Sequence, residues 1–100
     1  MLFFIKFKVE HKALSSEQLW DMVELESKAT LGAIAAGKIV ASYKVVGQRR
    51  VVTIIEAESH DELDRILMAG LPMAHYLEIE EILPLRPYEG FAKDVARRWK

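Results

Sequence analysis

Apolar and polar side chains alternate along the first segment of the chain. Phe3, Ile5, Phe7 and Val9 occupy every second position of "LFFIKFKVE", and both lysines fall between them. A period of two is typical of a β-strand. The segment therefore predicts a first strand with one fully apolar face.

The spacing of apolar residues changes in the next segment, "EQLWDMVELESKATLGAIAAG", which spans residues 17–37. A period near 3.6 residues predicts one long α-helix. Ser15 followed by Gln18 forms a capping-box signal at its start, and Gly37 provides a stop at its end. The apolar side of this helix comprises Leu19, Met22, Val23, Glu26, Ala29, Thr30, Ala33 and Ile34.

Glu26 is the one acid within this apolar side. An ionised carboxylate is costly to bury without a partner. One interpretation places Glu26 at the edge of the stripe, where it pairs with Lys28 or with a lysine of a strand. The other interpretation keeps Glu26 in an apolar setting because its carboxylate performs chemistry.

The rest of the chain repeats this alternation of strand and helix patterns. Two β-branched segments, "KIVASYKVV" and "RRVVTIIEA", flank Gly47 and Gln48 and predict a β-hairpin with a tight turn. Ser59 and Glu62 repeat the capping-box spacing, which predicts a shorter helix ending near Gly70. The segment "AHYLEIEEILPL" predicts a last strand, so the order is βαβ followed by βαβ.

This order indicates the α+β class, with a ferredoxin-like βαββαβ antiparallel sheet and both helices on one face. We expect residues 1–86 to form this domain and residues 87–100 to form a C-terminal helical tail, in which Phe91, Val95 and Trp99 recur at every fourth position. The strands are also apolar on the face that the helices leave uncovered. Such a face predicts a dimer packed sheet to sheet.

Charge and composition narrow the class of protein. Fourteen Lys and Arg residues against fifteen Asp and Glu residues leave no basic field for nucleic acid. The chain has no cysteine, and His11, His60 and His75 lack metal-ligand spacing, so no metal site is expected. The segment "MLFFIKFKV" is too short and too interrupted by lysine for a signal or membrane segment, and we expect a cytoplasmic protein without a membrane partner.

Several segments together resemble one enzyme family. The opening "MLFFIKFKV", the "LESK" acid of the long helix, the glycine turn after "YKVVG", "ESHDELDRIL" and above all "LPMAHYLEIE" are similar to muconolactone delta-isomerase and its chloromuconolactone dehalogenase relatives over residues 1–86. The resemblance implies a dimeric α+β barrel, or a decamer built from such dimers. It also implies a cofactor-free enzyme acting on a small lactone in aromatic catabolism, with Glu26 at the position of the family's proton-transfer residue.

The chemistry of such a reaction suits a carboxylate in this position. Isomerising a butenolide requires removal of a proton from a carbon next to a conjugated lactone and return of a proton two carbons away. One carboxylate on one face of the ring could do both. Burial among Met22, Val23, Ala29 and Thr30 would raise the pKa of Glu26 toward neutrality, where a general base works best.

Candidate substrate-binding residues lie around the hairpin turn and before the last strand. Tyr43, Lys44 and Arg49 match the aromatic and basic positions of the family's hairpin, although Arg49 replaces a tyrosine and leaves the substrate open. The alternative for these cations is a solvated turn. His75, Tyr76 and Phe4 are further candidates for the pocket lining, and Trp20 is expected in an oligomer contact or in helix packing.

Two other functions remain open at this point. The same fold could serve a cofactor-free monooxygenase of an electron-rich aromatic compound, in which a histidine or tryptophan in the pocket would matter more than Glu26. A non-catalytic small-molecule-binding or assembling barrel would have a closed pocket and a salt-bridged Glu26. The tail could likewise reach over a neighbouring subunit, pack on its own subunit or form a mobile end.

Overall fold

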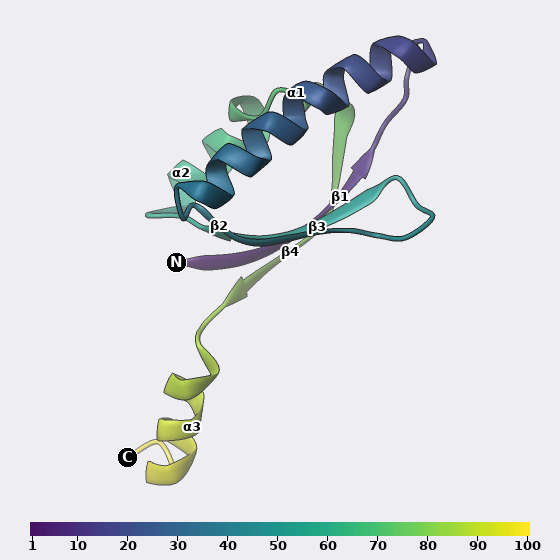
Figure 1. The fold of residues 1–100 in the computed structure, drawn as a ribbon. Coiled ribbons are helices and arrows are strands. Elements are labelled where there is room, and N and C mark those ends of the chain that lie inside the picture. Colours follow the sequence, from purple (N-terminus) through teal and green to yellow (C-terminus); the bar gives the residue numbers. More distant parts are fainter.

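Four antiparallel strands form one sheet in the computed structural model, which describes residues 1–100 (Figure 1). The strand order is β2-β3-β1-β4. The elements are β1 (Leu2–Val9), α1 (Ser16–Ala35), β2 (Ile39–Lys44), β3 (Arg50–Glu56), α2 (His60–Arg65), β4 (Leu77–Leu85) and α3 (Tyr88–Arg97). This arrangement confirms the predicted α+β class and the βαββαβ order.

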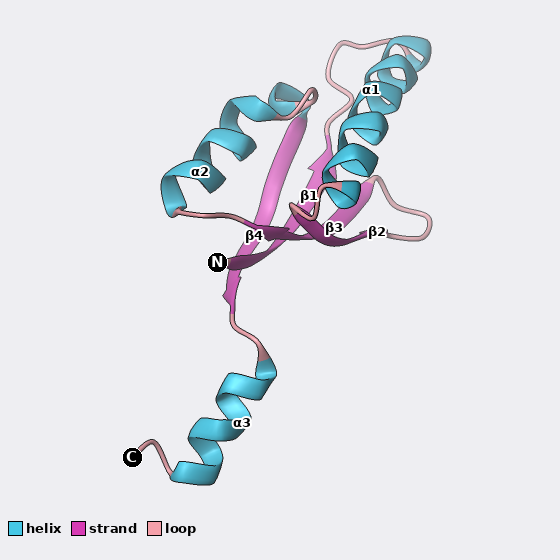
Figure 2. Ribbon diagram, turned by 60° about the vertical axis from the view of Figure 1, so that its left-hand side comes forward, coloured by secondary structure: helices cyan, strands magenta, loops and turns pink.

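Both helices of the repeat lie on one face of the sheet, as Figure 2 shows. The predicted capping box of α1 is present, because the Ser15 hydroxyl accepts from the Gln18 backbone N–H at 3.1 Å and the Gln18 side chain accepts from the Ser15 N–H at 2.9 Å. At α2, Ser59 accepts from the Glu62 N–H at 3.1 Å. The Glu62 carboxylate instead accepts from the Glu58 N–H at 2.7 Å, so only half of the second box forms.

The segment between α2 and β4 differs from the prediction. The helix changes to a π-helical turn over Ile66–Gly70. A short 3₁₀ turn over Ala74–Tyr76 then precedes β4, which begins at Leu77 rather than at Ala74. Pro72 explains the break, because it forces the preceding Leu71 into an extended conformation (φ −88°, ψ 141°).

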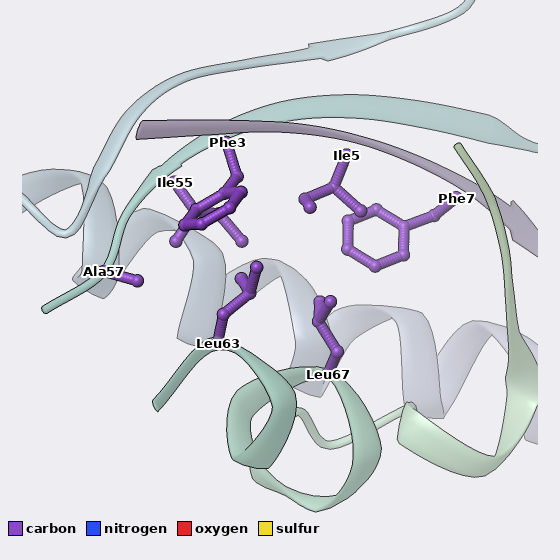
Figure 3. Packing of buried hydrophobic residues seen from close by; sticks show 7 residues of the cluster. All are labelled: Phe3, Ile5, Phe7, Ile55, Ala57, Leu63 and Leu67. Atoms are coloured by element: carbon purple, nitrogen blue, oxygen red, sulfur yellow. The ribbon is translucent and has the colours of Figure 1, made fainter. Parts of the chain in front are cut away.

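The hydrophobic core lies between the sheet and α2 (Figure 3). Its seven residues point toward one another from β1, from β3 and the residue after it, and from α2 and its π turn: Phe3, Ile5, Phe7, Ile55, Ala57, Leu63 and Leu67. Helix α1 contributes nothing to this cluster, and its only buried residue is Leu19. Of the predicted apolar side of α1, Ala29 and Ile34 are exposed. Helix α1 therefore covers the sheet without packing closely on it.

The opposite face of the sheet carries a patch of five apolar or aromatic residues, here called the open-face patch: Phe4, Tyr43, Val52, Ile54 and Leu83. Phe4 is paired with Ile54 on one side and with Leu83 on the other, and Tyr43 is paired with Val52. Charged residues continue this face, including Arg50, whose guanidinium binds the Glu80 carboxylate at 2.8 and 3.1 Å.

Helix α3 projects away from the domain, and Figures 1 and 2 both place it apart from the sheet, α1 and α2. Its aromatic residues contact one another, with Phe91 5.3 Å from Tyr88 and 6.2 Å from Trp99 between ring centroids. An ion pair of 2.7 Å joins Arg86 to Asp94. Of the alternatives for the tail, packing on its own subunit is wrong for this structure.

Candidate functional site

A cavity of about 610 Å³ lies between α1 and the sheet. Thirteen of its 20 lining residues are hydrophobic, so an occupant would be largely desolvated. The floor is formed by Val51, Thr53 and Ile55 of β3, and Leu71 and Met73 close one side. The cavity exists because the core is built from β1, β3 and α2, while Leu19 is the only fully buried residue of α1.

Glu26 lies in the lining of this cavity, on the middle of α1. Its Oε2 atom is buried and has no hydrogen-bond partner. Burial raises the pKa of Glu26, and a backbone hydrogen bond at Met73 offsets part of this rise. The interpretation in which Lys28 neutralises Glu26 is wrong, because Lys28 lies 3.6 Å from Glu24 instead. The structure therefore holds a carboxylate of raised basicity against an apolar space.

Two cations from the β2–β3 hairpin also line the cavity, and they differ in whether their side chains already make hydrogen bonds within the chain. The Lys44 ammonium donates to the backbone carbonyl of Val45 at 2.9 Å and to that of Gln48. These bonds leave it one of its three donors and tie it to the turn. None of the five ion pairs includes Arg49, and its side chain makes no hydrogen bond within the chain. Arg49 is the cation available to an anionic ligand.

Hydroxyl groups supply the remaining polar lining. Ser42 and Thr53 are joined by a hydrogen bond of 2.9 Å across β2 and β3, and both face the cavity. Ser27 and Thr30 face it from α1. Sequence reasoning missed Ser42, Ser27 and the role of Thr53. The available signal was the alternation of the hairpin strands, which places Ser42, Lys44 and Thr53 on one face.

Four predicted site residues do not line the cavity. Phe4 and Tyr43 lie on the opposite face of the sheet, where the Tyr43 residue is 67% exposed. His75 is exposed, and its carbonyl accepts a hydrogen bond from Lys12, whose ammonium also lies 5.4 Å from the centre of the Tyr76 ring. A substrate role for these four residues stays a prediction, but within one chain they do not meet Glu26.

Trp20 and Leu31 line the cavity although they lie outside the predicted apolar side of α1. Both are mostly exposed, at 61% and 65%. They form the rim of the cavity on α1 rather than its floor. Trp20 lies outside the apolar periodicity of α1, so the sequence alone could not distinguish a place at the cavity rim from an oligomer contact.

No three His, Asp or Glu side chains gather closely enough to hold a metal ion. None of the helices combines the length and the hydrophobicity that a membrane crossing requires. The chemistry available at the cavity is that of one basic carboxylate, one free guanidinium and several hydroxyl groups.

The raised pKa of Glu26 has a measurable effect on stability. Between the ordinary value of 4.5 and the raised value, the folded chain keeps a proton that the unfolded chain has lost, so this contribution to stability falls as pH rises. Glu26→Gln cannot lose that proton. The melting temperature of Glu26→Gln, relative to that of the wild type, should therefore rise as the pH is raised above 4.5. Glu24→Gln is the control, and a difference for Glu26→Gln that stays constant with pH would contradict the expectation.

Comparison with known proteins identifies a family that this chain matches. Residues 1–90 match the family model described as muconolactone delta-isomerase. A crystal structure of muconolactone isomerase superposes with a TM-score of 0.75 at 20% sequence identity, over 87% of this chain and 90% of that chain. A search of curated protein sequences found no match.

A second similar structure is 5-chloro-2-hydroxyhydroquinone dehydrochlorinase (TftG) from Burkholderia phenoliruptrix AC1100, in complex with 2,5-dihydroxybenzoquinone. It superposes with a TM-score of 0.60 at 20% identity, over 86% of this chain and 94% of that chain. At this identity the two structures establish a shared fold.

Proposed function

The chain belongs to the muconolactone delta-isomerase family, and we propose that it catalyses a cofactor-free 1,3-proton shift on a butenolide, as in the conversion of muconolactone to 3-oxoadipate enol-lactone. The observation that carries this proposal is the buried, unpartnered Oε2 of Glu26 in an apolar cavity. A base in such a setting is stronger than a solvated carboxylate.

The reaction can be written with Glu26 as the only proton carrier. Its carboxylate takes the proton from the ring carbon that bears the carboxymethyl arm, and the electron pair of that C–H bond enters the conjugated lactone as a dienolate. The resulting carboxylic acid returns the same proton to the ring carbon beside the lactone carbonyl. The C=C bond moves by one position, and Glu26 is regenerated as a carboxylate.

The other polar groups of the cavity can bind the negative charges of the substrate and of the dienolate intermediate. A dienolate carries negative charge on its carbonyl oxygen, and hydroxyl donors such as those of Ser42 and Thr53 can stabilise it. The carboxymethyl arm is a permanent anion, and a guanidinium binds a carboxylate through two parallel hydrogen bonds. Arg49 is free to do so.

Two alternatives are favoured less by the geometry. A cofactor-free monooxygenase finds support in Trp20, which lines the cavity, but no histidine does so. A non-catalytic barrel would pair Glu26 with a cation and close the pocket. An open cavity and an unpartnered carboxylate oxygen argue against that interpretation.

Nuclear magnetic resonance can test the proposal directly. Purified protein incubated with muconolactone in D₂O should remove the proton of the carbon bearing the carboxymethyl arm and give enol-lactone. If one carboxylate carries the proton, part of the product should retain protium at the carbon beside the carbonyl. No conversion at protein concentrations comparable to that of the substrate would exclude this lactone as the substrate.

Arg49 provides a test of substrate binding. Arg49→Ala should raise KM by about 10- to 100-fold, the loss expected for a charge-assisted hydrogen-bonded contact, with a smaller effect on kcat. Lys44→Ala should act mainly on the turn that Lys44 ties together. Arg50→Ala is the matched control, because Arg50 points to the opposite face and pairs with Glu80. An unchanged KM in Arg49→Ala would assign Arg49 to the solvated surface.

A further inference from the structure

The cavity is polar at one end and apolar at the other. Lys44 and Arg49 lie at the hairpin turn, and Figure 1 shows α1 starting near that end of the sheet and running toward the end where β2 begins. Glu26 stands midway along the helix. The far end of the cavity, beyond Glu26, is lined by Ile34, Ile39, Ile55 and Leu71.

The far end also adjoins a second, smaller cavity. Three residues, Ile39, Ile55 and Leu71, line both spaces, so they form part of the wall between the two. The second cavity has a volume of about 200 Å³ and lies beside Ala33 of α1 and Gly70. The side chains at the far end therefore have space into which they can move.

The size of the main cavity exceeds the need of a small ring. Cavities of roughly 300–1,000 Å³ enclose ligands of drug size, and the volume of 610 Å³ falls well within that range. A ligand whose carboxylate binds Arg49 and whose lactone ring reaches Glu26 would leave the far end empty. Water at that end would find almost no polar partner, so an apolar group is the favourable occupant.

We propose that the enzyme takes a lactone acid bearing an apolar substituent, which occupies the far end between Ile34, Ile39, Ile55 and Leu71. The substituent sits across the ring from the carboxymethyl arm, beside the lactone carbonyl. This inference rests on the proposed function for the orientation of the ring. It adds a specificity subsite that an unsubstituted muconolactone would not fill.

A homologous series of saturated lactone acids tests this subsite without turnover. The probes are the saturated analogue of muconolactone and its congeners with a methyl, propyl or butyl chain at the carbon beside the carbonyl. Calorimetry should show affinity rising about three- to fourfold for each methylene that enters the far end, the value for transfer of a methylene out of water. The gain from methyl to butyl should thus be about 30-fold or more. Affinity that does not change with chain length would overturn the proposal.

A variant that fills the far end sharpens the test. In Ile34→Trp, the larger indole should occupy the space meant for the chain, so the methyl and butyl analogues should bind with equal affinity. Leu25→Trp is the matched control, because Leu25 is an exposed residue of the same helix that lines neither cavity. A chain-length gain that is equal in both variants would also overturn the proposal. If Ile34→Trp does not fold, the wild-type series alone decides.

These results separate the subsite from the chemistry. A chain-dependent affinity together with failure to isomerise any lactone would remove the proposed reaction and leave the subsite. Isomerisation of muconolactone with a flat binding series would remove the subsite and leave the reaction.

Discussion

Glu26→Gln is expected to lower kcat for lactone isomerisation by roughly 10²- to 10⁴-fold, the usual contribution of a positioned general base. Glutamine keeps the size of the side chain and its place in the cavity but cannot accept the proton. The loss should appear in kcat rather than in KM, because the neutral amide can still contact the ring. Single-turnover measurements with muconolactone would separate the proton-transfer step from binding.

The same substitution should leave the fold intact. The buried Oε2 has no partner, so replacing a desolvated carboxylate with an amide should leave stability at neutral pH unchanged or improve it. Glu24→Gln, two residues away on the exposed side of α1, should retain full activity and lose only a surface ion pair with Lys28. Full activity with a clear loss of stability in Glu26→Gln would identify Glu26 as a structural residue.

Ile54→Lys is expected to separate the chain into folded monomers. We propose that two copies pack through the open-face patch, because partly exposed residues such as Phe4, Val52 and Ile54 would otherwise leave an apolar surface in water. Ile54 is paired with Phe4 in this patch, and each copy would lose about 1.5–3 kcal/mol of isoleucine burial. A dimer contains the substitution twice, and each copy also places a lysine in the interface. Ile54→Lys should therefore weaken dimerisation by at least about a thousandfold.

Sedimentation at micromolar protein concentration is the measurement. The matched control is Leu25→Lys, which places the same charge on an exposed position of α1, away from the sheet face. The wild type and Leu25→Lys should sediment as dimers or larger assemblies, and Ile54→Lys as a monomer with unchanged circular dichroism. A wild-type chain that is already a folded monomer would remove the proposed interface.

The elements of the fold could be predicted from the sequence because each has its own periodicity and its own boundary residues. Ser15 and Gln18 form the capping box that their spacing indicates. The π turn over Ile66–Gly70 could not be predicted, since it continues the helical pattern of apolar residues and changes only the backbone hydrogen bonding. The 3₁₀ turn over Ala74–Tyr76, which no pattern indicated either, moves the start of β4 to Leu77.

The candidate site could be predicted where a residue type contradicted its pattern. Glu26 was such a residue, because an acid within an apolar side requires an explanation. Tyr43 could have been placed outside this cavity, since adjacent residues of a strand point to opposite faces and Lys44 lines the cavity. The same rule separates Phe4 from Phe3 and Ile5. What the sequence could not provide is the distance between α1 and the sheet, which depends on how the whole core packs.

The loose packing of α1 on the sheet also affects the dynamics of this helix. A helix that buries only Leu19 is secured by few contacts, so its amide protons should exchange with solvent through partial opening long before those of β1 and β3. A bound ligand would supply the packing that the sheet does not give to this helix. Occupancy of the cavity would then slow amide exchange along α1, and binding affinity would include the free energy of holding the helix closed.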